Sequence, residues 1–153
     1  MNIEIRQKES FAVIGKEGST EEGAGFIARL WDEANTHFEE IKALIKTDEN
    51  GDPVGFWGAM SDLTRSFLPW ENFEKGLYLA GAECPLDAKA PEGWTKWVVP
   101  AYEYRVARKE SETAFPDTLR YLEENGLSLA GAVHDFTDPK TGEEYFFFPV
   151  KKL

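Results

Sequence analysis

The sequence has few of the residues that build covalent or metal-bound frameworks. It contains one cysteine, Cys84, and two histidines, His37 and His134. A lone cysteine forms no internal disulfide and points to a reducing compartment such as the cytoplasm. The cysteine and histidines match no zinc spacing, and the glycines form neither a phosphate-binding loop nor a dinucleotide fingerprint. We therefore expect no bound metal and no cofactor.

Basic residues and long apolar runs are also scarce. Seventeen basic residues stand against 28 acidic ones, which gives a formal net charge of −11. Such a surface repels DNA and anionic membranes, and no apolar run approaches the ~18 residues of a membrane span. The first residues alternate like a strand and do not resemble a signal peptide. We expect a soluble, cytoplasmic protein that binds neither nucleic acid nor membrane, and the acidity by itself serves solubility.

Aromatic residues, by contrast, are abundant. They make up 14% of the 153 residues, five of them tryptophan, and apolar residues as a whole reach 42%. A chain of this length and composition can bury a sizeable core. We therefore expect one domain over residues 1–153.

Hydrophobic periodicity predicts an α+β fold. Apolar residues at helical spacing indicate one helix from Ile27 to about Lys46 and a second from Thr113 to Asn125. Turn clusters separate alternating or apolar segments. Strands are expected at residues 3–6, 11–15, 54–62, 76–84, 94–99, 102–107, 129–136 and 145–150. The order is strand, strand, helix, strand, strand, given twice.

A local sequence match supports this duplication. The segment Gly58–Thr64 aligns with Gly131–Thr137, with four identical positions. In both copies a helix precedes the segment and an aromatic strand follows it. We predict two repeat halves, about 1–84 and 94–153, related by a pseudo-twofold axis with a cleft between them. Gly58 and Gly131 should then be structurally equivalent.

Several short motifs, taken in order, resemble one family. They are Glu4-x-Arg6 followed by Phe11–Gly15, Leu30-Trp31, Tyr78–Cys84, Pro91–Trp94 leading into Val99–Tyr104, and Phe147–Val150. Over essentially its whole length, the chain is similar to the GyrI-like domains, the effector-binding domains of AraC-type and related multidrug-sensing regulators. The resemblance implies a duplicated strand-helix-strand-strand unit, antiparallel sheets and two main helices, the SOUL/GyrI-like fold. The printed chain holds no helix-turn-helix segment, so we expect a standalone ligand-binding domain.

The resemblance also bears on charge in the pocket. Drug-binding members of the family place a glutamate on the strand after the second helix, where it meets cationic ligands. We align His134 with that position, so another carboxylate is needed for a cation. Glu83 follows four small or apolar residues, and a half-buried carboxylate there would contact a cation or activate water. A solvated role for Glu83 and a structural role for His134 stay open.

The expected cleft is aromatic. Aromatic rings offer a large flat contact area, and tyrosine and tryptophan also form hydrogen bonds. We expect Trp31 in the core and Trp70 at a rim. For the strand aromatics, pocket lining and core packing are both open. We place in the cleft Trp57, Tyr78, Trp94, Tyr104, His134, Phe136, Tyr145 and Phe147.

The resulting hypothesis is that the protein binds bulky hydrophobic or aromatic small molecules and sequesters a drug or toxin. One alternative is an enzyme, because some standalone GyrI-like proteins open the cyclopropane ring of DNA-alkylating natural products. Glu83 would then be the catalytic base. A second alternative is an interaction module that inhibits a protein such as gyrase by acidic mimicry of DNA. Turnover of a ligand, or tight binding to a basic protein, distinguishes these alternatives.

Overall fold

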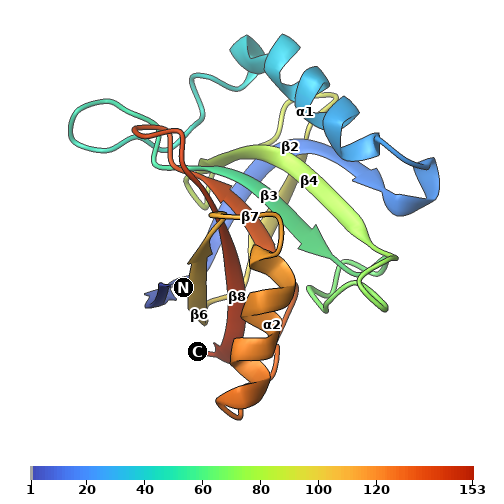
Figure 1. The fold of residues 1–153 in the computed structure, drawn as a ribbon. Coiled ribbons are helices and arrows are strands. Elements are labelled where there is room, and N and C mark those ends of the chain that lie inside the picture. Colours follow the sequence, from blue (N-terminus) through green and yellow to red (C-terminus); the bar gives the residue numbers. More distant parts are fainter. Residues whose placement is uncertain (1) are drawn as a thin grey trace.

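A computed structural model describes residues 2–153, which form one antiparallel sheet of eight strands with two α-helices (Figure 1). The strands are β1 (Ile3–Lys8), β2 (Phe11–Ser19), β3 (Phe56–Ser61), β4 (Leu77–Cys84), β5 (Thr95–Val99), β6 (Tyr102–Arg108), β7 (His134–Thr137) and β8 (Glu144–Lys152). The helices are α1 (Phe26–Thr36) and α2 (Ala114–Glu124), with short 3-10 helices η1 (Thr20–Glu22) and η2 (Phe38–Glu40). The predicted α+β class is confirmed.

The sheet has a duplicated strand order. Its neighbours run β1-β6-β8-β7-β3-β4-β2-β5, and every pair is antiparallel. The first half of the chain contains β1 to β4 and the second half contains β5 to β8. When the strands are numbered within their own half, the order from either edge to the centre is first, second, fourth and third. The edge strands are exchanged, because β1 pairs with β6 and β5 pairs with β2. Each half of the chain therefore lends its first strand to the other half, and β3 and β7 meet at the centre.

The heptapeptide match does not mark this symmetry. Gly58 lies inside β3 opposite Asp135, whereas Gly131 lies three residues before β7 begins. The expected equivalence of the two glycines is therefore wrong. The strand expected at residues 129–136 is also shorter: it begins at His134, and just before it the backbone N–H of Ala132 donates to Phe67, in the loop after β3. The duplication lies in the order of elements.

The first predicted helix is also shorter than expected. α1 ends at Thr36, and the apolar periodicity continues through η2 and further turns as far as Lys46. Phe38 and Ile41 still pack beside Ala34 in one cluster. Residues spaced three or four apart stay on one side in successive 3-10 turns as well as in an α-helix, so the periodicity did not locate the helix end.

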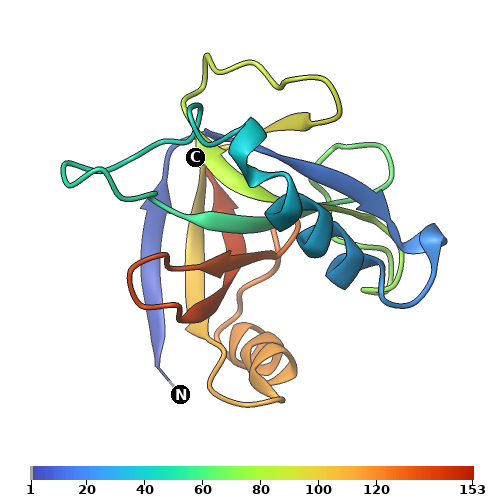
Figure 2. The same ribbon diagram turned by 90° about the horizontal axis from the view of Figure 1, so that it is seen from above.

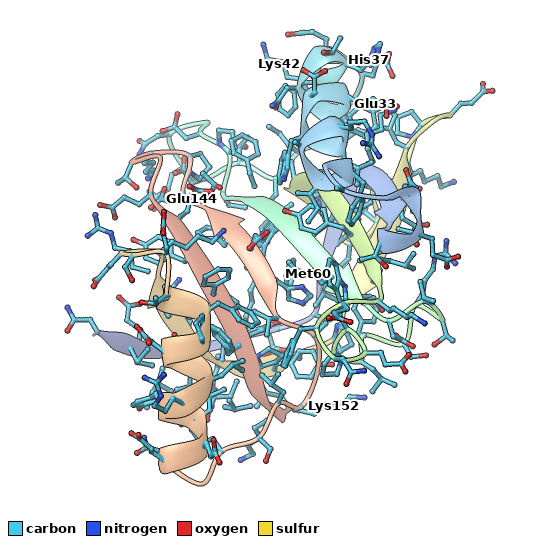
Figure 3. All side chains as sticks on the ribbon, turned by 45° about the vertical axis from the view of Figure 1, so that its right-hand side comes forward. Glu33, His37, Lys42, Met60, Glu144 and Lys152 are labelled. Carbon is cyan, nitrogen blue, oxygen red and sulfur yellow. The ribbon has the colours of Figure 1, made fainter. Side chains whose placement is uncertain are left out.

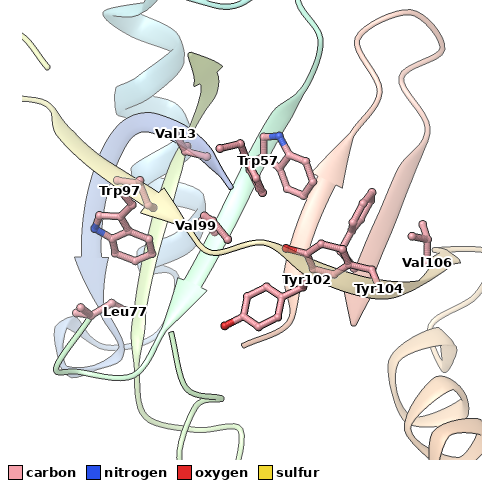
Figure 4. Close-up of a cluster of buried hydrophobic side chains, with 12 residues drawn as sticks. Val13, Trp57, Leu77, Trp97, Val99, Tyr102, Tyr104 and Val106 are labelled. Carbon is pink, nitrogen blue, oxygen red and sulfur yellow. The ribbon is translucent and has the colours of Figure 1, made fainter. Parts of the chain in front are cut away.

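The sheet has two unlike faces. Both helices lie on one of them, here called the helix face, with α1 over β2 and β4 and α2 near β6 (Figures 1 and 2). The other, here called the core face, carries the main cluster of buried side chains (Figure 4). Its members are Phe11, Val13, Trp57, Ala59, Leu77, Leu79, Trp97, Val99, Tyr102, Tyr104, Val106 and Phe147. Because strand residues alternate between faces, neighbouring positions have different surroundings.

Candidate functional site

A cavity of about 480 Å³ lies between α1 and the helix face. Helical spacing places Trp31, Ala34 and Asn35 on the side of α1 that faces the sheet. The chain after α1 adds Phe38 and Ile41, and the sheet and its loops close the other walls. These further lining residues are Phe56, Gly81, Trp94, Thr137 and Glu144. Aromatic walls and this volume are typical of small-molecule sites.

A chain of hydrogen bonds runs along the edge of this cavity. The Trp31 indole donates to the Tyr78 hydroxyl at 3.0 Å, and that hydroxyl donates to Oδ2 of Asp135 at 2.8 Å. Burial, together with the charge of Asp135, raises the pKa of Tyr78, so the hydroxyl stays protonated. Tyr78 lies on β4 and Asp135 on β7, with β3 between them. A Cβ atom added to Gly58 on β3 would lie 1.8 Å from the Tyr78 hydroxyl, so this glycine lets the ring cross β3.

Asp135 also binds a lysine. Nζ of Lys109 lies 3.0 Å from Oδ1 of Asp135 and 4.5 Å from the ring centroid of Phe146. Oε1 of Glu144 lies 4.0 Å from the same ammonium. The side chain of Asp135 is 20% exposed and that of Lys109 is 25% exposed. The Lys109 ammonium thus makes the two kinds of contact by which a protein site binds an organic cation, one with a carboxylate and one with an aromatic face.

A second cavity of about 310 Å³ lies on the same face, near α2. Its walls are Met60, Pro69, Trp70, Phe73, Phe115, Ala132, Val133 and Phe146. Figure 3 looks onto this face and shows Met60 between the two helices, with Glu144 at one end of β8. Asp135 lies between the cavities, since it pairs with Phe146 on β8, two residues from Glu144 of the first cavity. We call the two cavities together with Asp135 the helix-face groove.

The residues predicted to line one cleft are divided between the two faces. Tyr78 and Trp94 belong to clusters on the helix face. The others lie in or against the core-face cluster or beside it: Trp57, Glu83, Tyr104, His134, Phe136, Tyr145 and Phe147. Tyr104 and Phe147 are at most 1% exposed, so for these two rings core packing is the observed state.

The tryptophans outside the core face have partly unexpected positions. Trp94 lines the first cavity, where its indole donates to Oε1 of Glu40 at 2.9 Å and the Lys16 ammonium lies 4.2 Å from its ring. Trp31, expected in the core, also lines that cavity. Trp70 borders the second cavity from its loop, as a rim residue should. Sequence reasoning missed Trp31, Phe38 and Phe56 because an apolar stripe on a helix or strand does not say whether it fills a core or faces a cavity.

Glu83 does not face the helix-face groove. Its side chain is 3% exposed on the core side of β4, so it is not a solvated strand-end residue either. Oε1 accepts a hydrogen bond from the Trp57 indole at 3.1 Å, and the Lys8 ammonium lies 3.2 Å from both carboxylate oxygens. Nζ of Lys46 lies 3.9 Å from Oε2. A carboxylate whose oxygens are occupied in this way is poorly placed to take a proton from water.

His134 is buried on the core side of β7. Its Nδ1 accepts the backbone N–H of Met60 at 2.9 Å, so a neutral ring carries its proton on Nε2. Nε2 has no partner among the described residues. Burial lowers the pKa of His134 to about 3, and the ring is neutral near pH 7. The next residue, Asp135, points to the opposite face and into the groove. The carboxylate of β7 that faces the groove therefore belongs to Asp135, the residue after the one singled out from the sequence.

Within residues 2–153 no three His, Cys, Asp or Glu side chains converge on a common point. The same residues contain no helix that is both long enough and apolar enough to cross a membrane.

Solved structures match this chain, although neither a protein-family model nor a curated relative matches its sequence. SAV2435, solved bound to tetraphenylphosphonium, superposes with a TM-score of 0.63 at 16% identity, over 99% of this chain and 94% of that one. The chain has the GyrI-like fold.

Other structures share the GyrI-like fold. The C-terminal domain of EcmrR superposes with a TM-score of 0.66 at 12% identity, over 99% of this chain and 98% of that one. A putative transcription regulation protein of Staphylococcus aureus MU50 gives 0.59 at 17% identity, over 99% of both chains. In a complex of EcmrR with DNA, the match covers 58% of the longer EcmrR chain. At these identities the similarity establishes the fold.

The symmetry of the GyrI-like fold positions the groove. β3 and β7 are the third strands of the two halves and pair at the centre of the sheet. Asp135 lies on β7, opposite the glycine that admits Tyr78. The groove carboxylate therefore lies where the two halves meet.

Proposed function

We propose that the helix-face groove binds bulky, multi-ring hydrophobic small molecules. The observation that carries this proposal is the 480 Å³ cavity walled by Trp31, Phe38, Phe56 and Trp94. Rings of this kind bind flat apolar ligands at low entropic cost. The second cavity, beside α2, gives a large ligand room to extend past Asp135.

The groove also suits a hydrophobic cation. Asp135 and Glu144 contribute two carboxylates, and Lys109 contributes one ammonium. A cation that displaces Lys109 replaces one ion pair with Asp135 by another, and its apolar rings add contact with the aromatic walls of the groove. The structural neighbour SAV2435, solved with tetraphenylphosphonium, supports this ligand class.

We further propose that binding without turnover, as in sequestration of a drug or toxin, is the role of the protein. The hydrolase hypothesis relied on Glu83 as a base facing the ligand. Glu83 instead lies on the core face with its oxygens held by Trp57 and Lys8. A ligand incubated with the protein should therefore be recovered chemically unchanged.

The tryptophans provide a direct test. Each of the five indole N–H groups donates to a different acceptor: Trp31 to Tyr78, Trp57 to Glu83, Trp70 to Leu77, Trp94 to Glu40, and Trp97 to Glu17. Their ¹H–¹⁵N resonances, assigned by single Trp→Phe substitutions, should therefore report on separate places. Titration with tetraphenylphosphonium or a rhodamine should move the Trp31 and Trp94 resonances and leave that of Trp97 in place.

A matched pair of variants locates the site. Asn35 lines the cavity and Asp32 lies exposed on α1 outside it. Asn35→Phe should fill the cavity and weaken binding at least tenfold, whereas Asp32→Phe should leave the dissociation constant within about twofold. Equal effects of the two variants, or no ligand-induced shift at Trp31 and Trp94, would contradict the proposal.

A further inference from the structure

The core face has a pocket of its own, on the side of the sheet away from both helices. It has a volume of about 280 Å³. We call it the core-face pocket. Its walls are Arg6, Gln7, Lys8, Lys46, Val54, Trp57, Glu83, Phe136 and Phe147. Four of these residues were expected at a ligand site from the sequence, and this is where the structure brings them together.

The floor of this pocket is aromatic. The ring centroid of Trp57 lies 4.6 Å from that of Phe136 and 4.8 Å from that of Phe147, and the last two rings are 5.3 Å apart. Trp57 and Phe147 are at most 2% exposed, while Phe136 is half-buried. Phe136 therefore offers the accessible ring surface on which a flat group can lie, and the two buried rings pack against it.

The rim of the pocket is basic, although the chain as a whole carries a net charge of −11. Arg6, Lys8 and Lys46 line it, against one carboxylate, Glu83. Lys8 is committed to Glu83, with 3.2 Å to both oxygens. Lys46 pairs with Glu83 more weakly, since its Nζ lies 3.9 Å from Oε2 and its side chain is 55% exposed.

Arg6 is also only partly neutralised. Its guanidinium lies 5.5 Å from the Phe147 ring centroid, and it pairs with Glu4, whose side chain is 60% exposed. A surface pair of this kind contributes little and exchanges easily with other anions. Among the groups that line the pocket, positive charge exceeds negative charge by two.

We propose that the core-face pocket binds a small, flat aromatic anion, such as an aryl carboxylate or aryl sulfonate. The ring lies against Phe136 and the edge of Trp57, and the anionic group reaches the ammonium of Lys46 and the cations beside it. The volume lies just below the range of drug-sized sites, which limits the ligand to one or two fused rings. The site is separate from the helix-face groove and has the opposite charge preference, so the two proposals stand or fall independently.

Glu83 sets the affinity of this site through its charge. Its carboxylate competes with the ligand for Lys8 and Lys46 and repels the ligand's anionic group. Removing that charge while keeping the shape should therefore tighten anion binding. This sign is opposite to the one expected if Glu83 contacted a cationic ligand.

The experiment compares three probes of the same shape. The probes are 2-naphthoate, 2-naphthylmethylammonium and the neutral 2-naphthylmethanol, titrated into ¹⁵N-labelled protein at low salt. The naphthoate should move the Trp57 indole resonance and leave that of Trp97 in place. The ammonium compound should leave Trp57 in place, and added salt should weaken the naphthoate effect because the rim charges are exposed.

Single substitutions test the charges. Lys46→Gln should weaken naphthoate binding about tenfold, and Glu83→Gln should strengthen it severalfold. Lys42→Gln, which removes a charge of similar exposure from a lysine outside the pocket, should have no effect. Because Lys8→Gln leaves Glu83 without its closest partner and can destabilise the fold, Lys46→Gln is the deciding variant.

Three results would overturn the proposal. One is naphthoate moving the resonances of Trp31 or Trp94 while Trp57 stays fixed, which would assign the anion to the other face. Another is an identical dissociation constant in the Lys42→Gln and Lys46→Gln variants. The third is equal binding of the three probes, which would indicate apolar contact without recognition of charge.

Discussion

At the scale of single residues, Gly58 determines which side chains can meet in the groove. Its missing Cβ lets Tyr78 cross β3 and reach Asp135. The sequence indicated Tyr78 as a site residue. It indicated Gly58 only through the heptapeptide match with Gly131, which the structure does not bear out. The crossing could not be foreseen, because it depends on the register that places Gly58 between Ala80 and Asp135.

The face on which a residue lies was the least predictable property at this scale. His134 and Asp135 are neighbours, yet one is buried on the core face and the other faces the groove. Because side chains alternate along a strand, the two residues must lie on opposite faces of the sheet. The alternation does not predict which of the two faces the helices cover. Trp57, Tyr104 and Phe147 were ambiguous for the same reason, and the structure places all three in the core-face cluster.

Lys109 gives a prediction at the residue scale. Its ammonium pairs with the carboxylate of Asp135 and lies over the ring of Phe146, so a cationic ligand must displace it. Lys109→Met keeps much of the apolar stem and removes the competitor. The variant should bind tetraphenylphosphonium about tenfold more tightly, as measured by isothermal titration calorimetry.

A neutral ligand and a second variant complete that test. Binding of a neutral multi-ring compound should change little in Lys109→Met, because it makes no use of the freed carboxylate. Lys42→Met removes a lysine charge at an exposed site and is the matched control. If the cationic and neutral ligands gain affinity equally, Lys109 acts by filling space and not through its charge.

At the scale of secondary structure, local patterns located most strands to within a few residues. β4, β5, β6 and β8 coincide closely with the alternating or apolar segments expected from the sequence. The largest errors are the end of α1 and the start of β7. Both depend on where backbone groups find partners in distant loops, such as Ala132 donating to Phe67, which sequence periodicity does not encode.

The His134 ring accepts a backbone hydrogen bond at the centre of the sheet, in the place of a carbonyl group from a neighbouring strand. The β3–β7 ladder ends at Gly58 and Asp135, and beyond it the N–H of Met60 donates to the His134 ring. Burial holds the pKa of His134 at about 3 in the folded protein, against about 6.5 in an unfolded chain. Between these values the unfolded state binds a proton that the folded state does not.

Stability should therefore fall as the pH drops below about 6.5, and above that value this contribution is fully present. The loss from this one group approaches about 1.4 kcal/mol per pH unit. His134→Asn retains an acceptor near the Nδ1 position and cannot titrate. Urea denaturation from pH 7 to pH 4 should show a shallower decline for the variant than for the wild type, and parallel declines would contradict the assignment.

At the scale of the whole molecule, the order of elements was the most predictable feature. The sequence predicts the order strand, strand, helix, strand, strand, given twice, and the structure has this order. The exchange of β1 and β5 between halves cannot be read from the sequence, since pairing of an edge strand depends on which partner the completed core presents. The position of the groove at the junction of the halves follows from the symmetry, but its lining follows from α1 and the loops around it.

The exchanged strands lead to a prediction about folding. β1 pairs with β6, β5 with β2, and β3 with β7. The core-face cluster likewise mixes both halves, with Phe11 and Trp57 from the first and Tyr104 and Phe147 from the second. Fragments 1–89 and 90–153, cut in the exposed loop after β4, should each lack a closed core and be unfolded alone.

Mixed in equal amounts, the two fragments should associate and recover the dispersed ¹H–¹⁵N spectrum of the intact chain. Association would restore three strand pairings and rebuild the shared core, and that burial is the main driving force for folding. Trp57→Ala in the first fragment should abolish recovery, because the ring contacts Phe136 and Phe147 of the second. A dispersed spectrum from either fragment alone would show that the halves fold independently and that the strand exchange is not required for the fold.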